Sequence, residues 1–216
     1  MTPGSRTSAK RRRGTQAWFA ESAWQLPLPP PFVTPVPAPE PLTVFTIGHS
    51  NVSADEFLGL LHMHHAVTVL DVRSSPYSRY VPHFNRETLQ SMLLTRALAY
   101  EWAGDTLGGR PDDPTCYFGG AGTGKLDHGT VRQRSWYQSG IHHLLEIALR
   151  QRIVLLCSEE DPRRCHRHHL VARSLMDVGV RVLHIRRSGE VEDAESLDSP
   201  VQESGPHQLI LGGITA

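Results

Sequence analysis

The sequence contains little cysteine, no long apolar run and no excess of charge of either sign. Its three cysteines are unevenly spaced along 216 residues, which excludes the disulfide framework of a small secreted domain. No stretch reaches the ~18–20 consecutive apolar residues that a membrane-spanning helix needs. Lys and Arg number 22 and Asp and Glu also number 22, so overall charge does not direct the chain to nucleic acid or to an anionic membrane. These absences predict a cytoplasmic protein that has no membrane partner.

Composition changes sharply near residue 42 and divides the chain into three predicted parts. Residues 1–42 contain a basic cluster and a proline-dense run, which favours a disordered, extended arm. Residues 43–187 carry the regular apolar patterns of a folded domain, interrupted by an insertion at about 111–129. Residues 188–216 are acidic and aperiodic, so we expect a flexible tail there.

Apolar runs and helical spacings alternate through the predicted domain. Apolar runs predict strands at 43–47, 67–72, 97–102, 153–156 and 180–185. Helical spacing predicts helices at 54–63, 86–96, 130–150 and 166–178. Strands that are buried on both faces and separated by helices require crossover connections. The sequence therefore predicts an α/β fold, a three-layer sandwich with a mostly parallel sheet, flanked by disordered tails.

Polar residues directly follow three of the predicted strands, at 48–51, 71–76 and 157–162. Because ligands of open parallel sheets bind outside the carboxyl ends of the strands, we expect these segments to form one pocket. The candidate catalytic residues are His49, Asp71, Cys157, Glu159 and Cys165. The candidate ligand-binding residues are Ser50, Asn51, Arg73, Ser74, Arg79, Asn85, Arg110, His166 and Arg167.

The segment CSEEDPRRCHR, which begins at Cys157, allows several interpretations. An arginine follows Cys157 after five residues, as in the anion-binding loop of cysteine phosphatases and rhodanese-like sulfurtransferases. The loop has three carboxylates and no glycine, which disfavours that chemistry and favours a buried structural cysteine. Cys157, Cys165 and His166 offer ligands for zinc or iron. Arg167 and the first turn of the following helix favour the binding of an anion rather than a metal, and anion binding is the preferred interpretation of the segment at 165–167.

The other candidates also have ordinary explanations. Asp71 and Arg73 lie two residues apart on a strand and face the same way, so either they pair or Arg73 contacts a ligand. His49 belongs to a residue type suited to proton transfer, but the chain contains 13 histidines. Residues 74–85 interleave aromatics, hydroxyls and arginine, which fits a pocket cover or an ordinary surface loop. The segment GGAGTGKL at 119–126 begins like a phosphate-binding loop but lacks the hydroxyl after its lysine, so we expect a flexible insertion.

Taken in order, these motifs resemble the family named domain of unknown function 488. The resemblance covers about residues 43–187. It rests on TIGHS at 46–50, DVR at 71–73, LGGR at 107–110, and LC at 156–157 followed by CHR at 165–167. It implies a compact α/β fold in which these motifs gather at one site. It supplies no reaction, because no activity defines the family.

We therefore hypothesise an enzyme, a hydrolase or transferase, that binds a small anionic ligand at the strand ends. The expected ligand is a phosphate-bearing nucleotide or nucleic acid, held by Arg73 and Arg167. The first alternative is a metal-dependent or thiol-redox enzyme that uses Cys157, Cys165 and His166, with zinc or iron as cofactor. The second is a non-catalytic nucleic-acid-binding adaptor, to which the basic arm adds affinity.

Overall fold

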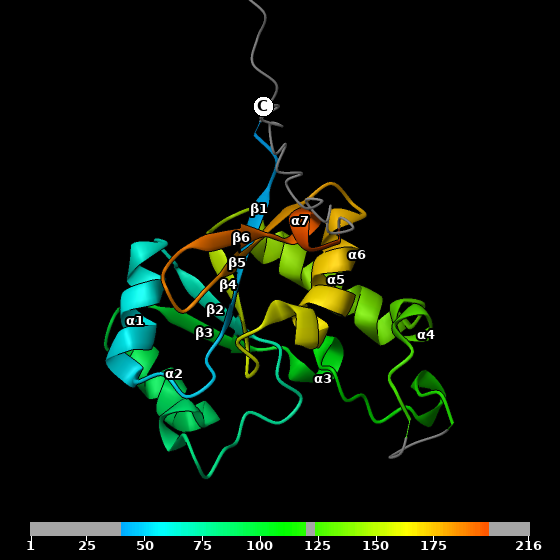
Figure 1. Ribbon diagram of the computed structural model, residues 1–216, viewed down its shortest axis with the longest axis horizontal. Coiled ribbons are helices and arrows are strands. Elements are labelled where there is room, and N and C mark those ends of the chain that lie inside the picture. Colours follow the sequence, from blue (N-terminus) through cyan, green and yellow to red (C-terminus); the bar gives the residue numbers. More distant parts are fainter. Residues whose placement is uncertain (1–39, 120–123, 199–216) are drawn as a thin grey trace, which may run out of the picture. The chain divides into compact units, whose positions relative to one another are not determined.

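The computed structural model describes residues 40–119 and 124–198 (Figure 1). Almost all of the predicted arm and the last part of the predicted tail lie outside these residues, as does the middle of the glycine-rich segment at 119–126. Within the described ranges, the structure contains no helix with the length and apolar character needed to cross a membrane.

A six-stranded sheet forms the middle layer of the described residues, in the order β3-β2-β4-β1-β5-β6. Strands β1 to β5 pair in parallel, and β6 pairs antiparallel with β5. The five predicted strands are all present, and the predicted α/β fold with a mostly parallel sheet is confirmed. The strands are β1 (Thr43–Gly48), β2 (Thr68–Asp71), β3 (Ala99–Trp102), β4 (Ile153–Cys157), β5 (Arg181–Ile185) and β6 (Val191–Asp193).

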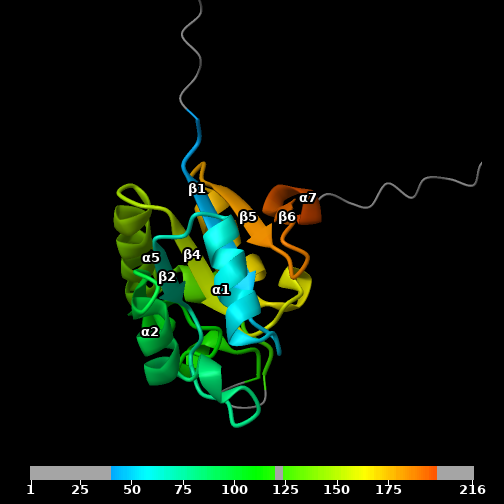
Figure 2. The same cartoon turned by 90° about the vertical axis from the view of Figure 1, so that its left-hand side faces the viewer.

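Helices cover both faces of the sheet. Helices α1 (Ala54–Met63) and α2 (Arg86–Leu94) lie on one face, and α1 stands in front of the sheet in Figure 2. Helix α5 (Ser135–Ala148), the π-helical segment η4 (Arg167–Ala172) and α6 (Arg173–Met176) lie on the other face (Figure 1). The remaining helices are short: α3 (Gly104–Leu107), α4 (His128–Arg132), α7 (Ala194–Asp198), and the 3-10 turns η1 (Pro82–Phe84), η2 (Pro114–Cys116) and η3 (Pro162–Arg164).

Two hydrophobic cores follow from the alternation of side chains along each strand. Val69 and Val154 pack with Phe57 on the face of α1 and α2. Their chain neighbours Leu70 and Leu155 belong to the other core, which includes the inner faces of α5, η4 and α6. Since both faces are covered, the inner strands are largely apolar, and their few interior polar side chains, such as Thr46 and His184, are buried and hydrogen-bonded to each other.

The structure differs from the predicted boundaries in three places. The predicted helix at 130–150 is two helices, α4 and α5, separated by a break at residues 133–134. The fold extends beyond residue 187, the predicted end of the domain, because β6 and α7 lie at 191–198. The predicted insertion also contributes to the core, since Cys116 in η2 is fully buried. These elements are short or lack apolar periodicity, so tertiary packing rather than local pattern defines them.

Gly48 ends β1 at the point where the loop after β4 passes closest. A Cβ atom at this position would overlap the carbonyl group of Glu159 and lie 2.8 Å from the Cα of Glu160. Both neighbours are backbone atoms, so no side chain can move aside to make room. Glycine at this position therefore allows β1 to contact the loop at 158–160.

We predict that Gly48→Ala lowers the free energy of unfolding by about 3 kcal/mol, because the added methyl group displaces backbone. The matched control is Gly59→Ala, since Gly59 lies in α1 and a Cβ there meets nothing within 4 Å. This control should raise the stability by about 0.5–1 kcal/mol through helix propensity. Urea unfolding curves measure both effects. Equal stability of Gly48→Ala and the parent would show that the loop does not pack against β1 as described.

Candidate functional site

The three predicted loops meet at the carboxyl ends of the neighbouring strands β2, β4 and β1. The backbone N–H of His49 donates to the carbonyl of Cys157 at 3.0 Å, and that of Ser50 donates to the carbonyl of Ser158 at 2.8 Å. On the other side, the N–H of Val72 donates to the carbonyl of Leu156 at 3.0 Å. Backbone pairing therefore continues past the strand ends and fixes the three loops side by side.

Two adjacent hollows open above these loops. The first, which we call the thiol pocket, has a volume of about 220 Å³. The second, which we call the tyrosine hollow, has a volume of about 470 Å³ and shares Arg73 and Ser158 with the first. The thiol pocket is lined by Arg73, Ser74, Ser75, Gly109, Arg110, Cys157, Ser158, Glu159, Arg164, Cys165 and His166. The tyrosine hollow is lined by His49, Ser50, Asn51, Arg73, Tyr77, Ser78, Tyr80, Val81 and Ser158.

The two cysteines of the thiol pocket are in direct contact. The Sγ atoms of Cys157 and Cys165 lie 3.1 Å apart, and the Cys165 thiol donates a hydrogen bond to Cys157. Both cysteines are free thiols, and both are buried, with 6% and 4% of their surface exposed. Cys157 is the last residue of β4, and Cys165 directly follows the turn η3. The strand and the turn together therefore hold the two sulfur atoms in place.

The environments of the two thiols push their pKa values apart. The hydrogen bond from Cys165 lowers the pKa of Cys157, and the charge of Arg167 and the backbone N–H groups of Glu159 and Ser158 act in the same direction, against burial. The same thiol–thiol hydrogen bond and burial raise the pKa of Cys165. The negative charge of a singly ionised pair therefore resides on Cys157.

His166 places one ring nitrogen beside both sulfur atoms. Its Nε2 lies 3.1 Å from the carbonyl oxygen of Val72, and because a carbonyl only accepts, Nε2 carries the proton. The unprotonated Nδ1 lies 3.8 Å from the Cys157 Sγ and 3.9 Å from the Cys165 Sγ. Gly109 makes room for the ring, since a Cβ at that position would lie 2.7 Å from the His166 Cγ. Cys157, Cys165 and His166 are thus the residues that could hold a metal, with ligand atoms all within 4.8 Å of one another.

Asp71 and Arg73 form a buried ion pair at the base of the two hollows. The Arg73 Nε donates to one carboxylate oxygen of Asp71 at 2.8 Å, and its Nη2 donates to the other at 2.6 Å. The Tyr100 hydroxyl also donates to Asp71 at 2.8 Å. Asp71 is fully buried and lines neither hollow, whereas Arg73 lines both. The carboxylate therefore fixes the guanidinium and offsets its charge.

His49 holds Arg73 from the other side. The Arg73 Nη1 donates to the His49 Nε2 at 3.1 Å, so the second ring nitrogen, Nδ1, carries the proton and donates to the carbonyl of Ser50 at 2.8 Å. Burial, reinforced by the charge of Arg73, lowers the pKa of His49 to about 4. Near neutral pH the ring is uncharged with both nitrogens engaged, an arrangement that positions Arg73 and leaves no ring nitrogen free for proton transfer.

Arg167 lies beneath the loop rather than in a pocket. Its side chain is fully buried, and its guanidinium donates to the carbonyl oxygens of Glu159 and Glu160, the latter at 2.6 Å. Its Nε donates to the Thr46 hydroxyl at 3.2 Å. Arg167 therefore holds the loop after β4 from below, and it lines neither hollow.

A chain of buried hydrogen bonds continues from Arg167 to the protein surface. Because the Arg167 Nε donates to Thr46, the Thr46 hydroxyl is free to donate to the His184 Nδ1 at 2.7 Å. The His184 Nε2 then donates to the His168 Nδ1 at 3.1 Å, and the His168 Nε2 donates to Asp198 at 3.1 Å. Each donor meets an acceptor when both histidines are neutral. Burial lowers the pKa of His184 to about 3, and it also lowers that of His168.

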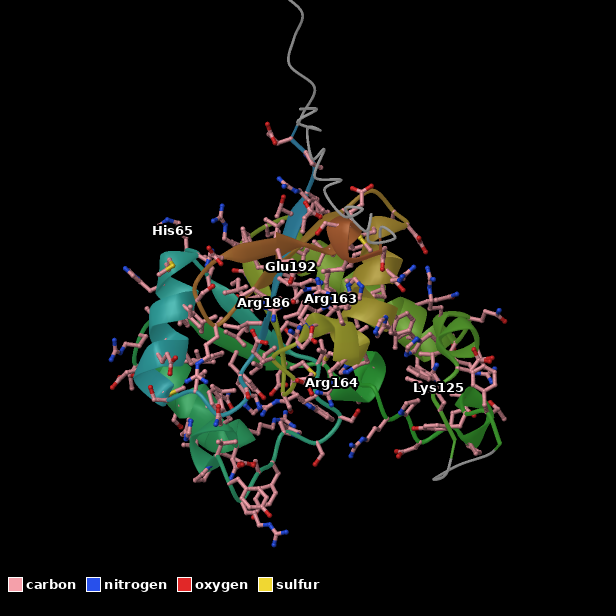
Figure 3. All side chains as sticks on the ribbon, viewed as in Figure 1. His65, Lys125, Arg163, Arg164, Arg186 and Glu192 are labelled. Atoms are coloured by element: carbon pink, nitrogen blue, oxygen red, sulfur yellow. The ribbon has the colours of Figure 1, made fainter. Side chains whose placement is uncertain are left out.

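Within the described part of the chain, two arginines that form no ion pair, Arg110 and Arg164, line the thiol pocket, which also contains one carboxylate, that of Glu159. By contrast, Arg163, the arginine of the cysteine–x5–arginine pattern, pairs with Glu192 at 2.6 Å. Figure 3 labels Arg163 beside Glu192 and Arg186, with Arg164 apart from them. Arg163 is therefore not available to close an anion-binding loop over Cys157.

The remaining predicted residues divide between lining and structural positions. Glu159 and Ser74 line the thiol pocket, and Ser50 and Asn51 line the tyrosine hollow. Arg79 stacks on Tyr80 and Asn85 accepts a hydrogen bond from the Ser78 N–H at 2.6 Å, so both shape the loop at 74–85 without lining a hollow. A hollow of about 640 Å³ elsewhere, beside α1, contains none of the candidate residues. Ser75 and Ser158 belong to the predicted segments at 71–76 and 157–162, and Gly109 belongs to the motif at 107–110. Sequence reasoning missed Arg164 as a lining residue and Tyr100 as a support of the site.

Comparison with known proteins gives one match. The family model described as "Domain of unknown function DUF488" matches residues 53–174, which include the thiol pair, Arg73 and Arg110. No curated protein and no solved structure gives a significant match.

We predict that stability falls as pH is lowered below about 6.5, the usual pKa of histidine in an unfolded chain. The folded-state pKa values of His49 and His184 are depressed to about 4 and about 3, so the neutral rings favour folding above that pH. When the pH is lowered from about 7.5 to 5.5, protonation of each of these two histidines in the unfolded chain should reduce the free energy of unfolding by about 1 kcal/mol. Urea unfolding at several pH values measures this loss of stability.

His49→Gln should lose less stability than the parent as the pH is lowered. His142→Gln, at an exposed position, should lose as much as the parent. An identical pH dependence in His49→Gln and the parent would contradict this assignment.

Proposed function

This chain belongs to the DUF488 family, and we propose that it is a thiol-dependent enzyme in which Cys157 attacks an anionic substrate and Cys165 completes the reaction. The observation that carries the proposal is the 3.1 Å contact between two free sulfur atoms at the end of a central strand. A thiolate that accepts hydrogen bonds and lies next to a second thiol is the arrangement of a redox-active dithiol.

The first step is attack of the Cys157 thiolate on a disulfide sulfur of the substrate. A mixed disulfide forms at Cys157, and the other half of the substrate leaves as a thiolate that takes a proton from solvent. The His166 Nδ1, 3.9 Å from the Cys165 Sγ, then accepts the Cys165 proton. The Cys165 thiolate attacks the Cys157 sulfur, the intramolecular disulfide forms, and the second half of the substrate leaves with the proton from His166. The substrate gains two electrons and the protein loses two, and a dithiol reductant restores the enzyme.

Two arginine side chains of the thiol pocket support an anionic substrate, since they outnumber its one carboxylate, that of Glu159. Arg110 and Arg164 form no ion pair in the described ranges, while Arg73 is already balanced by Asp71. We therefore assign anion binding to Arg110 and Arg164, with Arg73 as a fixed donor between the hollows. This replaces the expected pair of Arg73 and Arg167, because Arg167 donates to the loop carbonyls from beneath.

The neighbouring hollow favours a nucleotide as the anionic part of the disulfide substrate. Tyr77 and Tyr80 line the tyrosine hollow with 74% and 81% of their surfaces exposed, so each ring can stack on a base. Ser50 holds a left-handed φ of 42°, a strained conformation that turns the chain directly after His49. With the phosphate in the thiol pocket, Arg73 and Ser158 lie between phosphate and base. A disulfide in which one half carries a nucleotide satisfies both this arrangement and the thiol exchange, since a nucleotide alone has no sulfur–sulfur bond to reduce.

We predict that oxidised glutathione, an anionic disulfide, converts the reduced protein to an intramolecular disulfide without retaining glutathione. Cys165→Ser should instead accumulate a mixed disulfide, because no second thiol resolves it, and Cys157→Ser should react at least about tenfold more slowly. Intact mass and thiol titration measure these products. The control Cys116→Ala should behave like the parent, since Cys116 is fully buried and lines neither hollow. A Cys165→Ser protein that traps no glutathione, or a Cys157→Ser protein as reactive as the parent, would end the proposal.

We also predict that Arg110→Glu and Arg164→Glu each slow the reaction with oxidised glutathione by about tenfold, since each places a negative charge where the anion binds. The rate with the uncharged hydroxyethyl disulfide should change less than about twofold, which separates substrate binding from damage to the thiols. Arg150→Glu is the matched control, because Arg150 is exposed and lines neither hollow. Equal effects on both disulfides would exclude a role for these arginines in anion recognition.

A further inference from the structure

We infer that the reduced thiol pair and His166 together form a binding site for a thiophilic divalent cation, with Zn²⁺ as the best match. The inference goes beyond the proposed thiol chemistry and does not depend on it, because the metal uses the same atoms in their reduced state. It rests on the geometry of three ligand atoms, the fixed tautomer of the histidine and the free side of the cluster.

The three ligand atoms already approximate one face of a tetrahedron. With Zn–S and Zn–N bonds of about 2.3 and 2.0 Å, the edges between ligands should measure about 3.5–3.8 Å. The His166 Nδ1 lies 3.8 and 3.9 Å from the two sulfur atoms, close to this range. The sulfur atoms, at 3.1 Å, need to separate by only about 0.7 Å. A side-chain adjustment of this size lies within the freedom of a cysteine rotamer.

The histidine is held in the form that a metal requires. Its Nε2–H donates to the backbone carbonyl of Val72 at 3.1 Å, which leaves the Nδ1 lone pair directed at the sulfur atoms. Metal-binding histidines commonly donate the other ring nitrogen to a carbonyl or carboxylate in this way, because that bond fixes both tautomer and orientation. Two other nearby histidines do not offer a ligand here. Both nitrogens of His168 lie in the buried chain, and His169, whose Nε2 donates to the carbonyl of Arg163, does not line the thiol pocket.

The fourth coordination position lies on the side of the thiol pocket. Cys157, Cys165 and His166 all line that pocket, so a metal bound to them would face its free volume. Three protein ligands and one open position are typical of catalytic rather than structural zinc sites. Two thiolates offset the charge of the cation, and Arg110 and Arg164 at the pocket favour an anion or hydroxide as the fourth ligand. The same sulfur lone pairs cannot bind a metal and form a disulfide, so oxidation of the pair should release the cation.

The test uses the full chain, reduced and purified without a histidine tag, and titrated with Zn²⁺ against a chromophoric chelator. We expect one tight equivalent of Zn²⁺. Co²⁺ should give a thiolate-to-metal charge-transfer band and the intense visible bands of four-coordinate cobalt, which inorganic phosphate should shift if the open position faces the pocket. Conversion of the pair to the disulfide should abolish both signals.

Matched variants identify the ligands. Cys157→Ser, Cys165→Ser and His166→Asn should each weaken Co²⁺ binding at least about tenfold, whereas His169→Asn and Cys116→Ala should leave it unchanged. His166→Cys, which keeps a ligand at the same place, should retain the charge-transfer band and so separates loss of a ligand from loss of the fold. Absence of stoichiometric Zn²⁺ and Co²⁺ binding, or binding that survives Cys157→Ser, would overturn the inference. The glutathione reaction of metal-free protein is measured separately, so failure of the metal site and failure of the thiol chemistry give different results.

Discussion

The arrangement of the site depends on one buried positive charge, that of Arg167. No carboxylate in the described residues pairs with it, and its guanidinium instead donates to the carbonyls of Glu159 and Glu160 and to the Thr46 hydroxyl. An arginine so deeply buried is costly unless its donors are satisfied. The loop after β4 satisfies them, and in doing so it turns its carbonyls toward Arg167. The backbone N–H groups of that loop are then available to Cys157, and the nearby charge favours the Cys157 thiolate. One interaction thus sets both the path of the loop and the reactivity of the thiol.

A chain of hydrogen bonds connects buried Arg167 to Asp198, at the end of the last helix, α7. From Thr46 through His184 and His168 to Asp198, every bond has a single consistent direction when both histidines are neutral. Asp198 ends α7, in a segment whose sequence is acidic and aperiodic. Arg173 also pairs with this carboxylate, so Asp198 neutralises the positive charge of Arg173, which would otherwise remain beside the buried histidines. The residues after β5 therefore belong to the support of the site.

The sequence predicts the fold well because the inner strands are largely apolar, and it places the polar loops correctly because parallel strands end together. It does not predict which arginines face the ligand. Arg163, Arg164 and Arg167 lie within five positions of one another, and only the path of the loop decides that Arg163 pairs with Glu192, Arg164 lines the thiol pocket and Arg167 is buried. In the same way, Asp71 at the end of β2 and Arg73 in the loop after it pair as their spacing suggests, but the second support of Arg73, from His49, joins residues 24 positions apart. Contacts of this kind depend on strand order, which local patterns do not contain.

Thiol exchange and metal binding make opposite demands on the same pair of sulfur atoms. Exchange needs unequal thiols, one ionised and one protonated, and the single hydrogen bond from Cys165 to Cys157 provides that inequality. Metal binding needs both sulfurs ionised, and only a cation can hold two thiolates at such a short separation. His166 serves either state, since its Nδ1 can accept the Cys165 proton or donate its lone pair to a metal. Because the charge between the sulfurs decides which state exists, metal availability and the oxidation state of the pair should be thermodynamically linked: bound metal protects the thiols, and the disulfide excludes the metal.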